Sequence, residues 1–228
     1  MIDGMEVQGF ADARFALVRE CFADVLGGQA GTGAAFAAWC DGRRVVDLWG
    51  GHADRARTGP WQREQARAVD LTCLDDAFRA ANAAGRPTLY RQAIANPPGA
   101  QDPGVVNGAR WRAAEIPAIN GHGTARAVAD FYQALAAGRL LGPGMLAEAI
   151  TPQARGRDRV FGGDNAWGLG FGIDGDGYGM GGLGGSYGGT STAGGYTIGF
   201  VTGTVGSHDR IDALENALRD CLGLPAVS

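Results

Sequence analysis

Lysine is absent from this chain of 228 residues, because all twenty of its basic residues are arginines. Any chemistry that needs a lysine ammonium or amine is therefore excluded. The arginines are set against 24 carboxylates, which gives a net charge of −4, and no block of basic residues stands out. A protein that tracks phosphates needs such a block, so we expect no nucleic-acid partner.

Long apolar runs are also missing. No stretch approaches the ~18 apolar residues of a membrane helix, and residues 1–6 do not begin a charged segment followed by an apolar run. We therefore expect no membrane partner and a cytoplasmic location. The four cysteines are scattered without a Cys-x-x-Cys pair, which argues against a zinc site or a redox motif. We expect neither a metal nor a cofactor.

The apolar pattern predicts a helix near each end of the chain. Helical spacing runs from Ala11 to Leu26 and stops at Gly27-Gly28. A final helix is predicted to follow Ser207 as its N-cap. Its expected buried face holds Ile211, Leu214, Leu218 and Leu222, and Cys21 and Cys221 are expected on the apolar faces of the two helices.

A hairpin is predicted between residues 33–40 and 43–49, because Asp41-Gly42 tolerates the positive φ angles of a two-residue turn. A short helix is expected over 74–84, and the proline-rich stretch 85–123 favours irregular connections. The next helix should run from Thr124 as N-cap to Gly138. Its expected apolar face holds Val128, Phe131 and Leu135, and a second helix is expected over 144–150.

Glycine dominates the segment 161–206, which holds 19 of the 40 glycines. This density is typical of closely approaching strands and turns, so we predict three antiparallel strands there, with strand-like runs at 167–173 and 196–202. The whole chain is therefore predicted to be one α+β domain, 1–228, with an antiparallel sheet of about five strands packed against the N- and C-terminal helices. Residues 62–123 form a reduced, irregular helical region in this prediction.

Several motifs resemble those of the serine β-lactamase-related esterases, a group close to class C β-lactamases that includes the family VIII carboxylesterases. They are the hairpin region 33–51 with Pro60-Trp61-Gln62, then Ile116-Pro-Ala-Ile-Asn-Gly-His-Gly-Thr-Ala125, Trp167-Gly-Leu-Gly-Phe171 and Gly179-Met-Gly-Gly-Leu-Gly-Gly-Ser-Tyr187. They occur in the order expected for that family and cover about residues 5–65 and 110–225. The resemblance implies a β-lactamase-like domain.

The chain departs from that family at each catalytic motif. The resemblance implies a Ser-x-x-Lys helix and a Tyr-x-Asn element after Pro60-Trp61, yet residues 66–110 contain neither serine nor lysine. A Lys-Thr-Gly or His-x-Gly strand is implied where this chain has Met180-Gly181-Gly182. The same matching puts the Leu183 N–H at the position of an oxyanion-hole donor. A donor without a nucleophile cannot form an acyl-enzyme.

Weak catalytic candidates are Ser186, His122 and Tyr187. Ser186 lies in a Gly-x-Ser-x-Gly pattern, but the glycines and strand that follow it do not fit a nucleophile elbow. His122 could face the rim of the active site that the resemblance implies, or could hydrogen-bond its own loop. Tyr187 could reach a ligand or belong to the core, as could Tyr178. The expected ligand-binding residues are Met180, Gly181, Gly182, Leu183, Ser186, Tyr187, His122 and Arg112.

Two further glycine-rich patterns have simpler explanations. Residues 179–184 satisfy Gly-x-Gly-x-x-Gly, but no helix is predicted to follow, so a dinucleotide site is not expected. Asp174-Gly-Asp176 resembles the start of a calcium loop but lacks its later oxygen ligands, so a hairpin turn is predicted.

Three functions remain open from sequence. The first is a repurposed scaffold that binds a small molecule or transforms it without hydrolysis. The second is a serine hydrolase or esterase with Ser186 as an unorthodox nucleophile. The third is an interaction protein, with a possible homodimer, because loss of the helical half should uncover apolar surface. We take the first as the working hypothesis.

Overall fold

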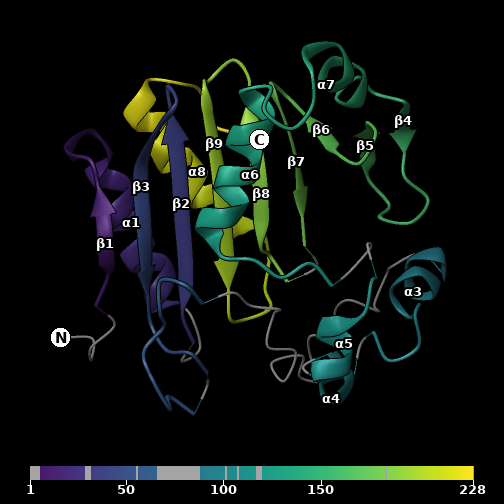
Figure 1. Ribbon diagram of the computed structural model, residues 1–228, viewed down its shortest axis with the longest axis horizontal. Helices are drawn as coiled ribbons and strands as arrows, with labels where there is room; N and C mark the ends of the chain where they lie inside the picture. The colour runs from purple at the N-terminus through teal and green to yellow at the C-terminus, as the bar shows by residue number, and fades with distance from the viewer. Residues whose placement is uncertain are drawn as a thin grey trace.

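The structure is a computed structural model that describes residues 6–28, 32–54, 56–65, 88–100, 102–106, 108–116, 120–182 and 184–227. Its described part contains one sheet of nine strands, all paired antiparallel, in the order β1-β3-β2-β9-β8-β7-β6-β5-β4 (Figure 1). The strands are β1 (Gln8–Ala11), β2 (Ala34–Cys40), β3 (Arg43–Gly50), β4 (Ala154–Arg157), β5 (Asp164–Trp167), β6 (Gly172–Asp174), β7 (Gly177–Gly181), β8 (Tyr187–Ser191) and β9 (Tyr196–Thr202).

Helices cover both faces of this sheet. They are η1 (Ala13–Phe15), α1 (Ala16–Gly27), α3 (Thr88–Ile94), α4 (Pro103–Val106), α5 (Ala109–Ala113), α6 (Ala125–Ala136), α7 (Pro143–Ala149) and α8 (Asp209–Leu222). The terminal helices α1 and α8 contact each other behind the sheet, and α6 crosses its front (Figure 1). The main core lies between the sheet and α1 and α8, where Phe22, Phe36, Phe200 and Leu214 are fully buried.

The predicted hairpin is confirmed. β2 and β3 pair across Asp41 (φ 50°) and Gly42 (φ 73°), the two positive φ angles that a type I′ turn requires. The predicted turn between Asp174 and Gly177 is also present, because β6 and β7 pair on either side of it.

The prediction of about five strands is wrong, because the described chain forms nine. The expected strand 167–173 is broken into the end of β5 and the start of β6 by a reversal at Gly170, whose φ is 87°. β1 and β4 were missed because their side chains are mostly exposed, so neither strand alternates between apolar and polar residues. Such short strands depend on pairing with their neighbours more than on their own composition.

Helix α6 has the predicted ends, and its buried face agrees with the prediction at Val128 and Leu135 but not at Phe131. The Thr124 hydroxyl accepts a hydrogen bond from the Ala127 N–H at 3.0 Å, and Gly138 has the expected positive φ. Phe131, however, is exposed, whereas Ala125 and Ala129 are buried. Ala125 and Ala129 face the sheet because Gly199 of β9 lets the α6 backbone approach it closely, and Gly188 of β8 leaves room for the side chains of Val128 and Tyr132.

The remaining elements agree with the prediction in part. The predicted helix 74–84 and Cys73 lie outside the described residues. Residues 85–123, expected to be irregular, contain the short helices α3, α4 and α5, and the expected helix over 144–150 is α7. The last helix begins after His208, and the Ser207 hydroxyl instead donates a hydrogen bond to Asp209.

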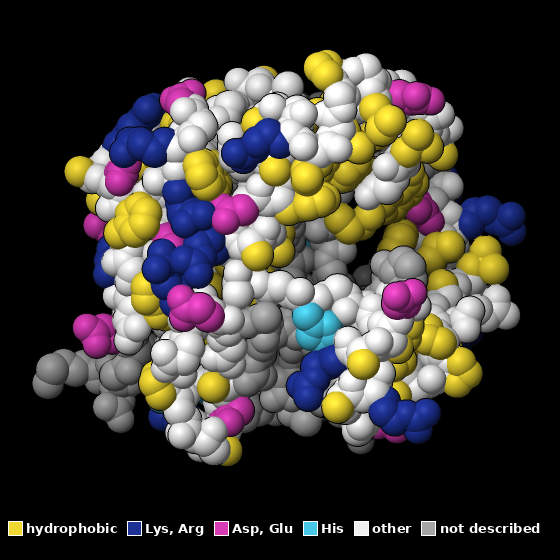
Figure 2. Space-filling model, viewed as in Figure 1, with side chains coloured by type: hydrophobic (Ala, Val, Ile, Leu, Met, Phe, Trp, Pro, Cys, Tyr) yellow, Lys and Arg dark blue, Asp and Glu magenta, His cyan; other side chains and the backbone are white. Residues whose placement is uncertain are grey.

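The first helix begins later than predicted, because β1 and η1 occupy its expected first turn. Cys21 and Cys221 are half-buried and pack against the main core, as expected for small apolar side chains. No helix in the described part of the chain is both long and apolar enough to cross a membrane. Figure 2 shows hydrophobic side chains gathered on the front face near α7.

Candidate functional site

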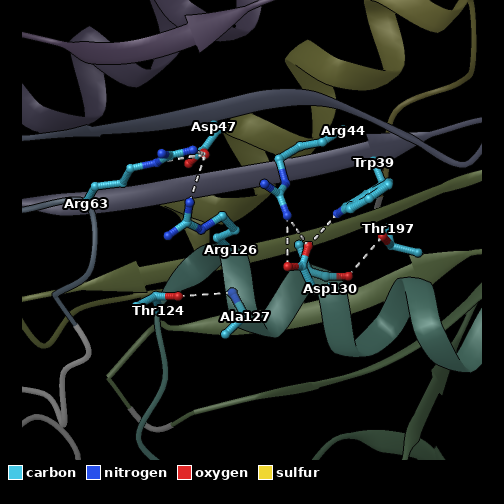
Figure 3. Close-up of polar contacts among 10 residues, drawn as sticks. Trp39, Arg44, Asp47, Arg63, Thr124, Arg126, Ala127, Asp130 and Thr197 are labelled. Carbon is cyan, nitrogen blue, oxygen red and sulfur yellow. Dashed lines mark hydrogen bonds and ion pairs between the residues drawn. The ribbon is translucent and has the colours of Figure 1, made fainter. Parts of the chain in front are cut away.

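Buried and half-buried ion pairs hold the front helix α6 and the segment before residue 66 on the sheet (Figure 3). Asp47, almost fully buried on β3, accepts hydrogen bonds from Arg63 at 2.7 and 3.2 Å, and Arg126 of α6 lies 3.9 Å from the same carboxylate. Arg44 donates to both carboxylate oxygens of Asp130, at 2.6 and 2.8 Å. These charged side chains pair with one another and attach α6 to the sheet, so we assign them a structural role. The candidate functional site lies in another part of the sheet.

A pocket of about 840 Å³ lies on the α8 side of the sheet, over β5, β6 and β7. Its floor is the glycine-rich face of these strands. A side chain at Gly181 would come within 2.6 Å of the His208 ring, and one at Gly179 would come within 2.5 Å of the Tyr187 hydroxyl. Glycine therefore lets His208 and Tyr187 lie directly against the strand backbone.

One stripe of helix α8 forms a wall of the pocket. His208, Asp212, Glu215 and Arg219 are spaced by four, three and four residues, which places them on one side of a helix, and all four line the pocket. Across from them lie Asp174 and Asp176 at the β6–β7 turn and Trp167 of β5, and the C-terminal residues 225–227 line the pocket beside α8, to which they are hydrogen-bonded.

The buried end of this wall is a connected polar network. Tyr196 donates a hydrogen bond to Glu215 at 2.5 Å, and Arg219 donates to the Tyr196 hydroxyl at 2.8 Å. Arg219 also lies 3.6 Å from Asp176, whose carboxylate accepts a hydrogen bond from Ser191 at 2.9 Å. The network anchors α8 to the floor strands and orients the pocket side of the helix.

Electrostatics in the pocket disfavour additional negative charge. Burial raises the pKa of Glu215, and the carboxylates of Asp212 and Asp176 raise it further. Partial burial also raises the pKa of Asp212, with Asp209 and Asp174 adding to the effect. Burial raises the pKa of Tyr187 as well. Burial is the largest cause of all three shifts. Neighbouring carboxylates add to it, whereas Arg219 and the hydrogen bond from Tyr196 lower the pKa of Glu215, and His208 lowers that of Asp212.

Only some of the predicted site residues meet in this pocket. Met180, Gly181 and Tyr187 line it, and Tyr178 does so while also packing in the cluster beneath α6. Gly182 is exposed at the start of the turn that leads to β8 and donates its N–H to the Ser186 carbonyl at 2.7 Å. Leu183 lies outside the described residues.

Three other predicted site residues do not line the pocket. Arg112 is exposed on α5. His122 has one ring nitrogen, Nδ1, 2.7 Å from the Asn120 carbonyl, which is the loop contact considered from sequence, and its other nitrogen is buried without a hydrogen-bond partner. Ser186 is followed directly by β8, and its hydroxyl accepts a 3.4 Å hydrogen bond from the Thr202 N–H.

The polar stripe of α8 was not identified from the sequence. Its spacing was available as a signal, since His208, Asp212, Glu215 and Arg219 repeat with helical period, but such a stripe is also typical of a solvated helix face. Asp174 and Asp176 were recognised only as turn residues. The sequence could not show that the turn and the helix face each other across glycine strands.

Comparison with known proteins identifies the family. The sequence model of the family described as Beta-lactamase matches residues 74–220, so the chain belongs to this family. A curated relative, the protein named Esterase/beta-lactamase LipL of Mycobacterium tuberculosis (strain ATCC 25618 / H37Rv), is 46% identical over 66 residues. That alignment covers 29% of this chain and 15% of the relative.

Solved structures confirm a β-lactamase-like fold. A family VIII carboxylesterase superposes with a TM-score of 0.78 at 20% identity, covering 95% of this chain and 100% of that one. A penicillin-binding protein homologue from Caulobacter crescentus gives 0.71 at 20% identity, with the same coverage. EstA from Arthrobacter nitroguajacolicus Rue61a gives 0.66 at 16% identity, covering 96% and 99% of the two chains. At these identities the likeness concerns the fold alone.

Proposed function

We propose that this β-lactamase-family protein binds a small molecule in the pocket beside Met180, Gly181 and Tyr187, and does not hydrolyse it by Ser-x-x-Lys chemistry. The pocket itself is the observation that carries the proposal. Its volume of about 840 Å³ suits a small organic ligand, and it combines aromatic and apolar walls with a few polar groups.

The composition supports the second half of the proposal. The chain has no lysine to activate a serine, and its four serines all lie at or after residue 186. Ser191 donates its hydroxyl hydrogen to Asp176, and Ser207 donates to Asp209. A carboxylate that accepts this hydrogen bond can orient the hydroxyl. In neither case does the hydroxyl donate to a lysine or histidine that could act as its general base.

Binding can be tested with the purified chain and a panel of hydrophobic metabolites, esters and amines, by thermal shift followed by isothermal titration calorimetry. We expect at least one compound to bind saturably. A bulky substitution on the floor, Gly172→Leu, should abolish binding, because its added Cβ meets its nearest neighbours at an ordinary 3.4 Å and its side chain fills the pocket. Gly144→Leu on the distant helix α7 should not. Absence of saturable binding across the panel would contradict the proposal.

A second candidate function is hydrolysis with Ser186 as nucleophile. It is favoured by the names of the relatives, which include esterase and carboxylesterase. Within the described residues, however, Ser186 has no hydrogen bond to a histidine that could act as its base. Incubation with a fluorophosphonate, followed by intact mass measurement of the parent and of Ser186→Ala, distinguishes the two. We expect an unmodified parent chain; modification lost only in Ser186→Ala would favour the hydrolase.

The interaction-protein alternative stays a prediction. Large apolar side chains are exposed on the front face around α7, with Leu140 at 52% and Met145 at 61% exposure. Surface of this kind favours self-association. Sedimentation velocity over a range of concentrations tests this, and a purely monomeric protein would weaken it.

A further inference from the structure

The pocket carries far more negative than positive charge. Its carboxylate-bearing lining residues are Asp164, Asp174, Asp176, Asp212 and Glu215. Arg219 is the one arginine in the lining and is committed to Asp176 at 3.6 Å and to Tyr196 at 2.8 Å. The pocket therefore keeps a surplus of carboxylates that Arg219 does not neutralise.

Two of these carboxylates lack a hydrogen bond and an ion pair within the described part of the protein, although His208, one turn before Asp212, lowers the pKa of Asp212. Asp174 on β6 and Asp212 on α8 form neither a hydrogen bond nor an ion pair with any described residue. They lie close enough for the charge of Asp174 to raise the pKa of Asp212, and the charge of Asp212 in turn raises that of Glu215. A positive charge placed among the three would relieve this mutual repulsion.

The shape of the pocket favours an organic cation over a metal ion. Among the described residues, no group of three or more metal-ligating side chains is close enough to hold one ion. The pocket volume of about 840 Å³ is also much larger than a metal site.

Apolar and aromatic groups occupy the rest of the lining. The Trp167 ring lies over Gly172, where an added Cβ would be 3.5 Å from it, and residues 225–227 supply further apolar surface. Trp167 offers an aromatic face that can interact with a cation. The Tyr187 hydroxyl has no hydrogen bond to a described residue, so it is free to bond a ligand. These features are independent of the carboxylates and suit a ligand with an apolar body.

We propose that the pocket between α8 and strands β5–β7 binds a small organic cation, a protonated amine or guanidinium joined to an apolar group. The proposal rests on the proposed function and names the ligand class of the same pocket. Asp174 and Asp212 face the positive charge, with Glu215 one turn further along α8; Tyr187 hydrogen-bonds the ligand, and Trp167 packs against its apolar part.

Three probes with the same ring and different charge test this: 2-phenylethylamine, 2-phenylethanol and phenylacetate, titrated calorimetrically into the full chain at pH 7.5. We expect the amine to bind saturably and at least about tenfold more tightly than the alcohol, because a single ion pair at short range is worth this much. Phenylacetate should not bind. Added salt should weaken binding of the amine only.

A matched pair of variants on helix α8 tests the location. Asp212→Asn should weaken binding of the amine about five- to tenfold. Asp220→Asn removes the same charge from the same helix outside the pocket lining and should leave the affinity unchanged. Both positions are exposed, so both variants are expected to fold, and circular dichroism verifies this before titration.

The outcomes separate the ligand class from the proposed function. Equal affinity for the amine and the alcohol, or preference for phenylacetate, would overturn the cation assignment while small-molecule binding stands. Equal weakening by Asp212→Asn and Asp220→Asn would overturn the location. Failure of the amine to bind overturns the inference; failure of the whole compound panel as well would overturn the proposed function with it.

Discussion

Replacing Gly199 by alanine should strongly destabilise the fold, because α6 lies against the backbone of β9 at this residue. An added Cβ would lie 2.2 Å from the Ala125 carbonyl oxygen and 2.8 Å from the Ala129 nitrogen. A comfortable carbon–oxygen contact is about 3.3 Å, so the helix would have to move by roughly 1 Å. The clashing atoms belong to the backbone, which cannot rotate away as a side chain can.

The free-energy cost of moving α6 depends on the contacts that this helix makes with the sheet. Shifting it loosens the packing of Tyr132 and Leu135 and strains the contact between Arg126 and Asp47. Overpacking costs about 1–3 kcal/mol, and a backbone clash belongs at the upper end or above. For a chain of this size, about 3 kcal/mol corresponds to a fall in Tm of roughly 6–12 °C.

The assay is thermal unfolding followed by circular dichroism, with a urea titration to obtain the free energy of unfolding. Gly144→Ala is the matched control, because an added Cβ on this helical residue meets nothing within 4 Å. The control should be stabilised by about 0.5–1 kcal/mol through reduced backbone entropy of the unfolded chain. A Gly199→Ala protein that melts within about 2 °C of the parent would refute the packing described for α6.

Three further predictions concern single polar groups. Because the folded pKa of Glu215 lies above its ordinary value of 4.5, the folded state binds more protons than the unfolded state above that pH, and stability falls as pH rises through the folded pKa. Between pH 4.5 and 7.5 the Tm of Glu215→Gln should therefore fall less than the Tm of the parent. The same pH dependence of Tm in both proteins would contradict the raised pKa of Glu215. Thr124→Ala removes the N-cap of α6 and should cost about 1 kcal/mol by urea titration, with rescue by Thr124→Ser. A double-mutant cycle on Arg44 and Asp130 should give a coupling energy of about 0.2–1 kcal/mol, because both side chains keep partial contact with solvent; a coupling energy of zero would contradict a stabilising role for this ion pair.

Local features of the fold were predictable because neighbouring residues alone produce them. The Asp41-Gly42 turn needs two positive φ angles, and an Asp-Gly pair accepts them at low cost. The ends of α6 follow from Thr124 and Gly138, which supply a hydroxyl acceptor and a left-handed backbone conformation.

The buried face of α6 was not predictable in the same way. Periodicity favoured Phe131 because a large apolar side chain is usually buried. The structure exposes it, since Gly199 of β9 draws the side of α6 that holds Ala125 and Ala129 onto the sheet, and Tyr132 is buried beside them. Which face of a helix is buried depends here on the shape of its partner.

The sequence by itself determined which catalytic motif these 228 residues lack. Without lysine, and without a serine before residue 186, no Ser-x-x-Lys nucleophile can exist in the chain, whatever its fold. Tertiary structure alone decided where a ligand could bind. The pocket exists because antiparallel pairing carries Asp174 to the edge of a glycine floor that faces Asp212 and Glu215 on α8, residues far apart in the chain. Their juxtaposition depends on long-range strand pairing, which leaves no local pattern in the sequence.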